Sequence, residues 1–349
     1  MRTRRKLEHL RLALELPLGP GATGFEDVFL VHNAVPELEL NQIELGTEFL
    51  GRRLQAPLLI NAMSGGINEA RDINESLAML AAEYGLGMAV GSQIIGVEED
   101  ACLESFQVVR QVNPGGLVLA NVSALAKVSV AMRAVEMVEA DGLQVHLNVP
   151  QELAMAEGDR KFEGVLDNIH ELVERLPVPV IVKEVGFGMS REVADKLISV
   201  GVKYLDIGGH GGTNFIAIEN ERGGLFDEEM ALWGIPTAVS LIEVLSLNRE
   251  VKVIATGGIS SPLRAAKALG LGADLVGVAG ILLKVLQGGG REKLSRWMDT
   301  YLYRLKAICL MTGARTPFEL RRQPIVIVGK TAEWLRVRGI DVSSWGRRQ

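Results

Sequence analysis

The chain has 349 residues, of which 48% are hydrophobic, so it can bury a large core. Its formal net charge of -6 at pH 7 argues against a general nucleic-acid binder. Its two cysteines, Cys102 and Cys309, are too few for a disulfide framework and favour a reducing, cytoplasmic location. Since no apolar run reaches the roughly 18 residues of a membrane-spanning helix, we expect no membrane partner.

Residues 1–56 precede any regular alternation of elements, and we expect them to form an N-terminal cap or arm. Their basic start lacks the apolar run of a signal peptide, and acidic residues follow it, so we expect it to belong to the folded protein. Arg5 and Lys6 are a candidate phosphate-binding pair, with a solvated basic tail as the alternative.

Eight short apolar runs then alternate with segments of helical periodicity. Eight such units predict an α/β fold, a closed (β/α)8 TIM barrel over residues 57–287, in preference to an open doubly wound sheet. Residues 288–349 are expected to form a C-terminal helical extension, and residues 208–234 to cover the site. The predicted strands are 57–62, 87–91, 117–122, 143–148, 178–184, 202–207, 251–256 and 275–278, and clear helical patterns occupy 74–83, 129–139, 165–175, 191–199 and 262–269.

Small and polar residues follow all eight predicted strands, where barrel enzymes of this kind place their chemistry. Residues 208–213 read Gly-Gly-His-Gly-Gly-Thr, and such glycines let backbone N–H groups approach an anion closely. Gly257 and Gly258 follow the seventh strand, and Ala279 and Gly280 follow the eighth. These two loops are the usual phosphate site of a barrel, although a glycine pair can also simply turn the chain.

Lys183 lies on the fifth predicted strand, on the same side as Ile181 and Val185, so we expect it to face the barrel interior. Because buried lysines are rare unless paired, it indicates an anionic ligand, with a structural ion pair as the alternative. Beside a flavin ring, such a lysine would stabilise negative charge on the reduced ring.

The fourth predicted strand carries the densest group of polar residues. His146 and Asn148 lie two residues apart and share a face of the strand, and Gln151 and Glu152 follow directly. Glu152 is the best single metal candidate, because one carboxylate suits Mg²⁺ that is held mainly by substrate phosphates. A solvated loop glutamate is the alternative.

These segments together resemble the type II, FMN-dependent isopentenyl-diphosphate isomerases over nearly the whole chain. The most specific match is His-Leu-Asn-Val-Pro-Gln-Glu at residues 146–152, whereas glycine pairs and Lys183 alone would suit any FMN barrel. The other matching stretches are Arg5 and Lys6 with His9, and residues 31–37, 61–66, 90–93, 182–186, 211–213 and 233–234.

The resemblance implies a set of binding residues. FMN would contact Ala62, Met63, Ser64, Ser92, Asn121, Lys183, Thr213, Gly257, Gly258, Ala279 and Gly280. The substrate would be bound by Arg5, Lys6, Ser92, Gln93, His146, Asn148 and Gln151, and Glu152 would hold Mg²⁺ on its diphosphate. Two positions depart from the family pattern. Ile94 stands where many members have an arginine, so one phosphate contact is missing or supplied elsewhere, and Ser64 replaces a threonine but keeps the hydroxyl.

The implied reaction is a 1,3-allylic proton shift that converts isopentenyl into dimethylallyl diphosphate in isoprenoid biosynthesis. Reduced FMN would act as acid–base and electrostatic catalyst, with NAD(P)H as its reductant, and Gln151 and His146 are the candidate catalytic side chains. The strand ends hold no obvious carboxylate pair for acid–base work, which agrees with this implication. The resemblance also implies a homo-oligomer, a tetramer or an octamer.

Two other interpretations remain at this point. An FMN-dependent 2-hydroxy-acid oxidoreductase would use His210 as base and Arg222 to clamp the substrate carboxylate. Transient flavin reduction by a 2-hydroxy acid would support that alternative. A non-catalytic phosphate-binding or assembly protein would show neither bound flavin nor turnover.

Overall fold

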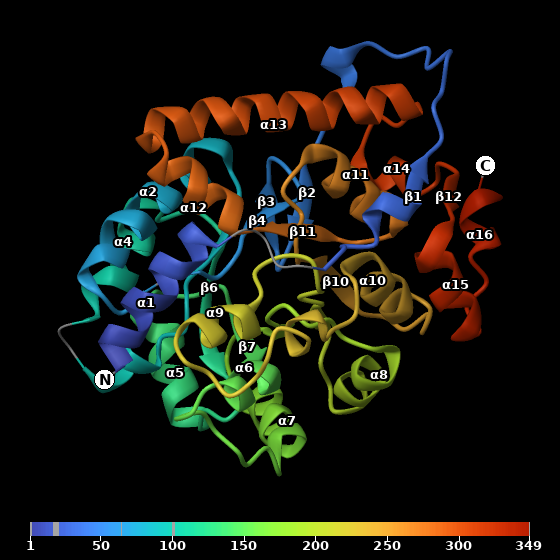
Figure 1. The fold of residues 1–349 in the computed structure, drawn as a ribbon. Coiled ribbons are helices and arrows are strands. Elements are labelled where there is room, and N and C mark those ends of the chain that lie inside the picture. The colour runs from blue at the N-terminus through green and yellow to red at the C-terminus, as the bar shows by residue number, and fades with distance from the viewer. Residues whose placement is uncertain (1, 17–20, 64, 100–101, 349) are drawn as a thin grey trace.

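The protein is described here by a computed structural model covering residues 2–16, 21–63, 65–99 and 102–348. Within these residues, eight parallel strands close into a barrel, and each strand pairs with the next along the chain until the last pairs with the first (Figure 1). The predicted (β/α)8 barrel is therefore confirmed. The strands are β4 (Leu58–Ile60), β5 (Gly87–Ala89), β6 (Val118–Ser123), β7 (Gly142–Leu147), β8 (Val180–Glu184), β9 (Tyr204–Asp206), β10 (Lys252–Ala255) and β11 (Leu275–Val278).

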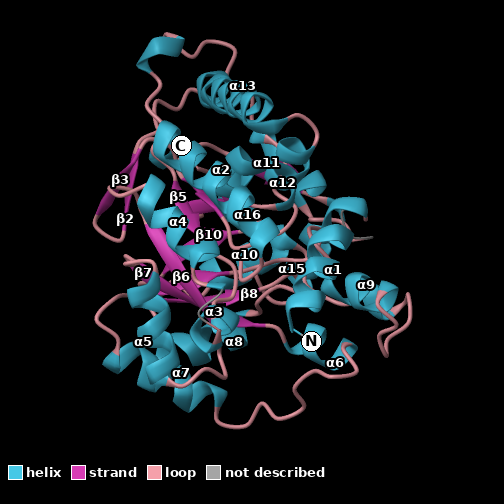
Figure 2. Cartoon of the chain, turned by 90° about the vertical axis from the view of Figure 1, so that its left-hand side faces the viewer, coloured by secondary structure: helices cyan, strands magenta, loops and turns pink. Residues whose placement is uncertain are grey.

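Helices follow the strands and surround the barrel (Figure 2). Capping side chains start several of them. Ser190 accepts a hydrogen bond from the backbone N–H of Val193 at the start of α8, and Ser261 caps α11 ahead of a proline in its first turn. The helices are α2 (Asn68–Tyr84), α3 (Ile94–Glu98), α4 (Glu104–Val112), α5 (Val128–Met137), α6 (Val149–Ala154), α7 (Val165–Arg175), α8 (Arg191–Ser199), α9 (Phe215–Glu221), η4 (Met230–Leu232), α10 (Thr237–Leu245), α11 (Pro262–Leu271) and α12 (Gly280–Gln287).

The two faces of each barrel strand bury different residues. On β8, Val180 and Val182 pack outward into the large core shared with the helices, whereas Ile181 points into the barrel. Apolar side chains fill the amino-terminal half of the interior, and the hairpin of β2 (Thr47–Phe49) and β3 (Arg52–Leu54) closes that end, where the ring of Phe49 meets Tyr204 edge-on. The interior becomes polar toward the carboxyl ends of the strands, which leaves that end for a site.

Segments from both ends of the chain join outside the barrel. The strand β1 (Val28–Leu30) pairs antiparallel with β12 (Ile325–Ile327), so the C-terminal extension, predicted as helical, also contributes a strand. The long helix α13 packs against α11 and α12. The remaining elements are α1 (Arg2–Glu15), η1 (Phe25–Asp27), η2 (Leu40–Gln42), α13 (Gly290–Thr312), α14 (Pro317–Leu320), α15 (Gly329–Val337) and α16 (Ser343–Gly346).

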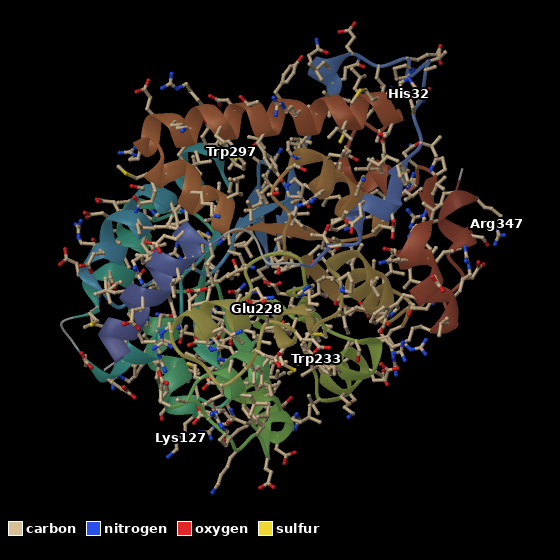
Figure 3. All side chains as sticks on the ribbon, in the orientation of Figure 1. His32, Lys127, Glu228, Trp233, Trp297 and Arg347 are labelled. Carbon is tan, nitrogen blue, oxygen red and sulfur yellow. The ribbon has the colours of Figure 1, made fainter. Side chains whose placement is uncertain are left out.

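The segment after β9, residues 208–234, contains α9 and η4. Its helix α9 packs against both α1 and α6, and Glu228 and Trp233 mark the segment over the centre of the molecule in Figure 3. His32 lies exposed near the end of α13 (Figure 3).

Of the helices described, none has both the length and the apolar character that crossing a membrane requires.

Candidate active site

The N-terminal helix α1 brings Lys6 to the carboxyl ends of β4 and β5. The Nζ of Lys6 donates to the carbonyl oxygens of Gly65, at 2.6 Å, and Ser92, at 2.9 Å, and it lies 5.4 Å from the centroid of the Phe106 ring. A Cβ on Gly66, which has a φ of +79°, would come within 2.8 Å of this Nζ. The positive φ of Gly66 favours glycine at this position. The structure brings Lys6 and Ser92 together.

A cluster of charged side chains fastens α1 onto α9. The Nε2 of His9 and Oε1 of Glu219 lie 2.7 Å apart, and Arg222 pairs with Glu8 at 3.0 Å, with Glu157 at 3.3 Å and with Glu219. Burial alone would raise the pKa of Glu219, but His9 and Arg222 outweigh it, so this pKa lies below its usual value. Arg5 lies at the edge of the cluster, 4.0 Å from Glu157.

The residues that the hydroxy-acid alternative needs are engaged elsewhere. Arg222 is bound to three carboxylates of the protein itself, which leaves it poorly placed to clamp a substrate carboxylate. His210 is 4% exposed, and its ring fills the space that a Cβ on Gly21 would occupy. Burial lowers the pKa of His210.

The motif at residues 146–152 spans the end of β7 and the start of α6. Asn148 is the N-cap residue of α6, and its Nδ2 donates to Oε1 of Glu152 at 2.8 Å and to Oε1 of Gln151 at 3.4 Å. The other carboxylate oxygen of Glu152 accepts from the backbone N–H of Asp159 at 2.8 Å. The structure therefore brings Asn148, Gln151 and Glu152 together beside His146, as the sequence predicts.

His146 lies at the rim of the barrel, with its Nδ1 2.8 Å from Oδ1 of Asn121. Burial, with the charges of Lys183 and Lys6 nearby, lowers the pKa of His146 to about 4. The ring is therefore neutral at neutral pH in this state.

Among the described residues, no group of three or more His, Cys, Asp or Glu side chains could hold a metal ion. Glu152 can offer one carboxylate. A magnesium ion bound there would need its other ligands from phosphate oxygens and water, which is the usual arrangement for this ion.

Lys183 points into the barrel, and the alternation along β8 predicts this orientation correctly. Its Nζ lies 3.4 Å from Oδ2 of Asp206 and donates to the carbonyl of Glu184 at 2.7 Å, so the structural ion pair that we kept as an alternative is present. Burial raises the pKa of Glu184 to about 7, although the backbone N–H groups of Phe187 and Gly186 partly oppose the rise.

Three loops meet where the sequence predicts a phosphate site. A Cβ on Gly212 would lie 2.4 Å from the nitrogen of Gly258, and one on Gly258 would lie 2.2 Å from the oxygen of Gly211, so only glycines allow these backbones to interlock. A Cβ on Gly280 would meet only Oγ1 of Thr213, at 3.7 Å, which shows room beside that hydroxyl.

The helix α12 begins in this space. Its N-cap residue, Ala279, makes no capping hydrogen bond through its side chain, which leaves the N–H groups of Gly280 and Ile281 for an anion, whereas that of Leu282 donates to the carbonyl of Ala279. Open backbone, a hydroxyl and a helix N-terminus suit the phosphate of FMN. The predicted residues that surround this region are Thr213, Gly257, Gly258, Ala279 and Gly280, and those that lie at the rim or inside the barrel are Ala62, Met63, Ser92, Asn121 and Lys183.

Gln93 is fully buried behind β6, where its Nε2 donates to the carbonyl of Ala134 at 2.9 Å and its Oε1 accepts from the N–H of Asn121 at 2.8 Å. Both ends of its amide are occupied within the protein, and the substrate contact of Gln93 stays a prediction. Ser64 lies outside the described residues.

The sequence reasoning missed three polar residues inside the barrel: Asn61, Gln144 and Asp206. All three are almost completely buried and hydrogen-bonded to one another. Gln144 precedes His146 by two positions on β7, so strand alternation could have identified it.

Comparisons with known proteins identify the family of the chain. A family model described as FMN-dependent dehydrogenase matches residues 120–327. Two solved structures share the fold. A mandelate oxidase variant with a monooxide FMN adduct has a TM-score of 0.66 and 15% identity, with 92% of each chain covered. A putative lactate oxidase of Pediococcus acidilactici has a TM-score of 0.69 and 15% identity, with 94% of this chain and 93% of that one covered.

Two curated proteins are much more similar in sequence. The isopentenyl-diphosphate delta-isomerase of Moorella thermoacetica is 51% identical over 337 residues, which cover 97% of each chain. The protein of the same name from Symbiobacterium thermophilum is 48% identical, over 100% of this chain and 99% of that one. The chain therefore belongs to the isopentenyl-diphosphate delta-isomerase family, and its barrel to the FMN-dependent dehydrogenases.

Proposed function

We propose that this protein isomerises isopentenyl diphosphate to dimethylallyl diphosphate and so serves isoprenoid biosynthesis. The observation that carries the proposal is the grouping of His146, Asn148, Gln151 and Glu152 beside Lys6, in a chain of this family. The reaction adds a proton to the terminal alkene carbon and removes one from the allylic carbon, so it is redox-neutral.

The diphosphate binds at the rim between α1 and α6. Lys6 and Arg5 supply positive charge, while Asn148 orients the carboxylate of Glu152, which would hold a magnesium ion that neutralises the diphosphate. Because α1 is fastened to α9, these cations stay over the barrel mouth. A substrate anchored in this way extends its alkene toward the strand ends.

FMN, when bound in its reduced form, would supply an electron-rich ring for acid–base chemistry and for stabilising positive charge on the alkene. Lys183, inside the barrel, holds a positive charge where negative charge on that ring would be stabilised. Gln151 lies against the reacting carbons and orients them. NAD(P)H provides the electrons that keep the flavin reduced.

Purified protein with FMN, Mg²⁺ and isopentenyl diphosphate tests the proposal when oxygen is excluded. We expect dimethylallyl diphosphate to form after NADPH is added and not before. Loss of flavin colour on addition of a 2-hydroxy acid, without isomerisation, would instead identify an oxidoreductase.

Substituting Gln151→Ala should lower isomerisation by about 100-fold, because orientation of the reacting carbons is lost while the flavin site is untouched. Product formation and flavin content are the two measurements. Gln111→Ala, on the exposed face of α4, is the matched control and should behave like the wild type. Full turnover of the Gln151→Ala protein would remove Gln151 from the mechanism.

We also propose that the protein is a cytoplasmic homo-oligomer, a tetramer or an octamer. The free thiols of Cys102 and Cys309 suit a reducing compartment. Exposed apolar side chains of the terminal segments, including Phe29, Val326 and Val337, offer contact surface. Light scattering on the purified protein measures the assembly, and a monomer at micromolar concentration would contradict it.

A further inference from the structure

A continuous chain of side-chain hydrogen bonds crosses the barrel interior from Asp206 to His146. Asn61 donates to Asp206 at 2.7 Å, and Gln144 donates to Oδ1 of Asn61 at 2.9 Å. Asn121 donates to Oε1 of Gln144 at 3.1 Å, and its own Oδ1 lies 2.8 Å from Nδ1 of His146. The chain links residues of β9, β7 and β6 with Asn61, which directly follows β4, and its members other than His146 are almost completely buried.

At the Asp206 end of this chain, the structure fixes which groups donate and which accept hydrogen bonds. The carboxylate of Asp206 accepts hydrogen bonds from Thr256 at 2.5 Å and from the N–H of Gly208 at 3.3 Å, and Lys183 lies 3.4 Å away. The backbone N–H of Ala62 donates to Oδ1 of Asn61 at 2.8 Å. A backbone N–H can only donate, so the Asn61 amide presents its oxygen to Ala62 and its nitrogen to Asp206.

The same direction of hydrogen-bond donation continues along the chain to His146. If the amide of Gln144 were reversed, its oxygen would face Oδ1 of Asn61 and the Asp206 carboxylate, and its nitrogen would face Nδ2 of Asn121. Both contacts would be repulsive in a buried setting. Gln144 therefore presents its oxygen to Asn121, and Asn121 presents its oxygen to His146. An amide oxygen only accepts, so Nδ1 of His146 must carry a hydrogen.

We propose that Asn61, Gln144 and Asn121, anchored on Asp206, are positioning residues that hold the proton of His146 on Nδ1 and leave the lone pair on Nε2. Within the described residues, Nε2 makes no hydrogen bond. It is then the ring position that can gain or lose a proton without breaking the chain. The low pKa of His146 agrees with a neutral ring in this state.

What this tautomer of His146 means for diphosphate binding rests on the proposed function. A neutral imidazole meets the diphosphate, whose oxygens are acceptors, with a lone pair. A hydrogen bond from Nε2 to an unprotonated phosphate oxygen therefore requires one added proton. Transfer from a phosphate hydroxyl would supply it, leaving that oxygen deprotonated and the ring cationic beside the anion. The hydrogen-bond chain makes Nε2, and not Nδ1, the atom at which this proton is gained and returned.

The test is the ¹⁵N spectrum of FMN-bound enzyme in which only histidine is labelled, recorded at neutral pH. The chain has five histidines, and comparison with His146→Gln identifies the signals of His146. We expect a protonated Nδ1 and an unprotonated Nε2 in the wild type. A neutral ring with its hydrogen on Nε2 would overturn the inference without any further variant.

A matched pair of interior variants tests the chain itself. Gln144→Met keeps the size of the side chain but removes the link, so the His146 signals should shift toward a mixture of tautomers and kcat should fall by roughly tenfold or more. Thr256→Val removes a different hydrogen bond to Asp206 and should leave the tautomer unchanged. An unchanged His146 spectrum in Gln144→Met would contradict the proposal.

The spectrum separates this inference from the proposed function because it needs no turnover. A protein with the Nδ1–H tautomer that fails to isomerise would refute the proposed function while leaving the positioning chain in place. An active isomerase whose His146 carries its hydrogen on Nε2 would do the reverse.

Discussion

The barrel interior and the N-terminal helix serve the same site through different kinds of interaction. Inside the barrel, Asp206 is fully buried and is held by amides, a hydroxyl and Lys183. The helix α1 is held by a cluster of ion pairs in which Glu219 is buried but Glu8 and Glu157 are 29% and 44% exposed. Solvent and salt screen the second kind of contact and hardly reach the first. The interior is therefore set by folding, whereas the arm can respond to solution conditions.

The largest expected effect is on stability, and it lies in the interior. Lys183→Met leaves the buried carboxylate of Asp206 without its cation and should lower the free energy of unfolding by about 3–5 kcal/mol. Urea unfolding of the flavin-free proteins measures it. Lys252→Ala breaks a pair with Asp274 in which the lysine is 60% exposed, and it should cost less than about 1 kcal/mol. Equal losses of unfolding free energy in the two variants would contradict the distinction between interior and surface ion pairs.

Two buried glutamates should respond to pH with opposite signs. The pKa of Glu184 is raised from 4.5 to about 7, so the folded state binds its proton more tightly and stability falls as pH rises through this window, by up to about 3 kcal/mol. The pKa of Glu219 is lowered, so its contribution is present above about pH 4.5 and is lost as pH falls below that value.

Thermal unfolding between pH 3 and pH 8 tests both signs. Glu184→Gln should reduce the fall in stability above pH 5. Glu219→Gln should reduce the loss of stability at the acid end of the range. If Glu184→Gln keeps the wild-type slope between pH 5 and pH 7, the raised pKa of Glu184 is wrong.

The smallest expected effect lies in the arm. Arg222→Gln loosens α1 and should raise KM for isopentenyl diphosphate by roughly tenfold with little change in kcat, because Lys6 and Arg5 lose their fixed position. Adding salt should reduce the difference in KM between this variant and the wild type. Arg71→Gln, which breaks an ion-pair cluster on α2, is the control and should leave KM unchanged. A fall in kcat alone would place Arg222 in the chemistry.

Much of the fold follows from the sequence because a barrel strand is a local pattern. All eight strands overlap the predicted runs, and alternation along β8 places Lys183 inside correctly. The short strand β12 was missed, since three β-branched residues inside a helical region carry little signal.

The contacts between distant segments could not be predicted in the same way. The side chain of Gln93 turns behind β6 because the strand pattern has already ended there, at the N-cap of α3. Asp206 meets Asn61 across the barrel, from strands that are not neighbours in the sheet. Arg222 pairs with Glu8, more than 200 positions away, which no local pattern could reveal.

Isomerisation in deuterated water tests the central claim most directly, because proton addition and removal must leave an isotopic record. The enzyme is kept reduced and anaerobic with isopentenyl diphosphate and Mg²⁺, and the product is analysed by mass and by NMR. We predict dimethylallyl diphosphate with deuterium in the methyl group formed from the terminal alkene carbon. A product that forms at the full rate and carries no deuterium would contradict a reaction by proton addition and removal.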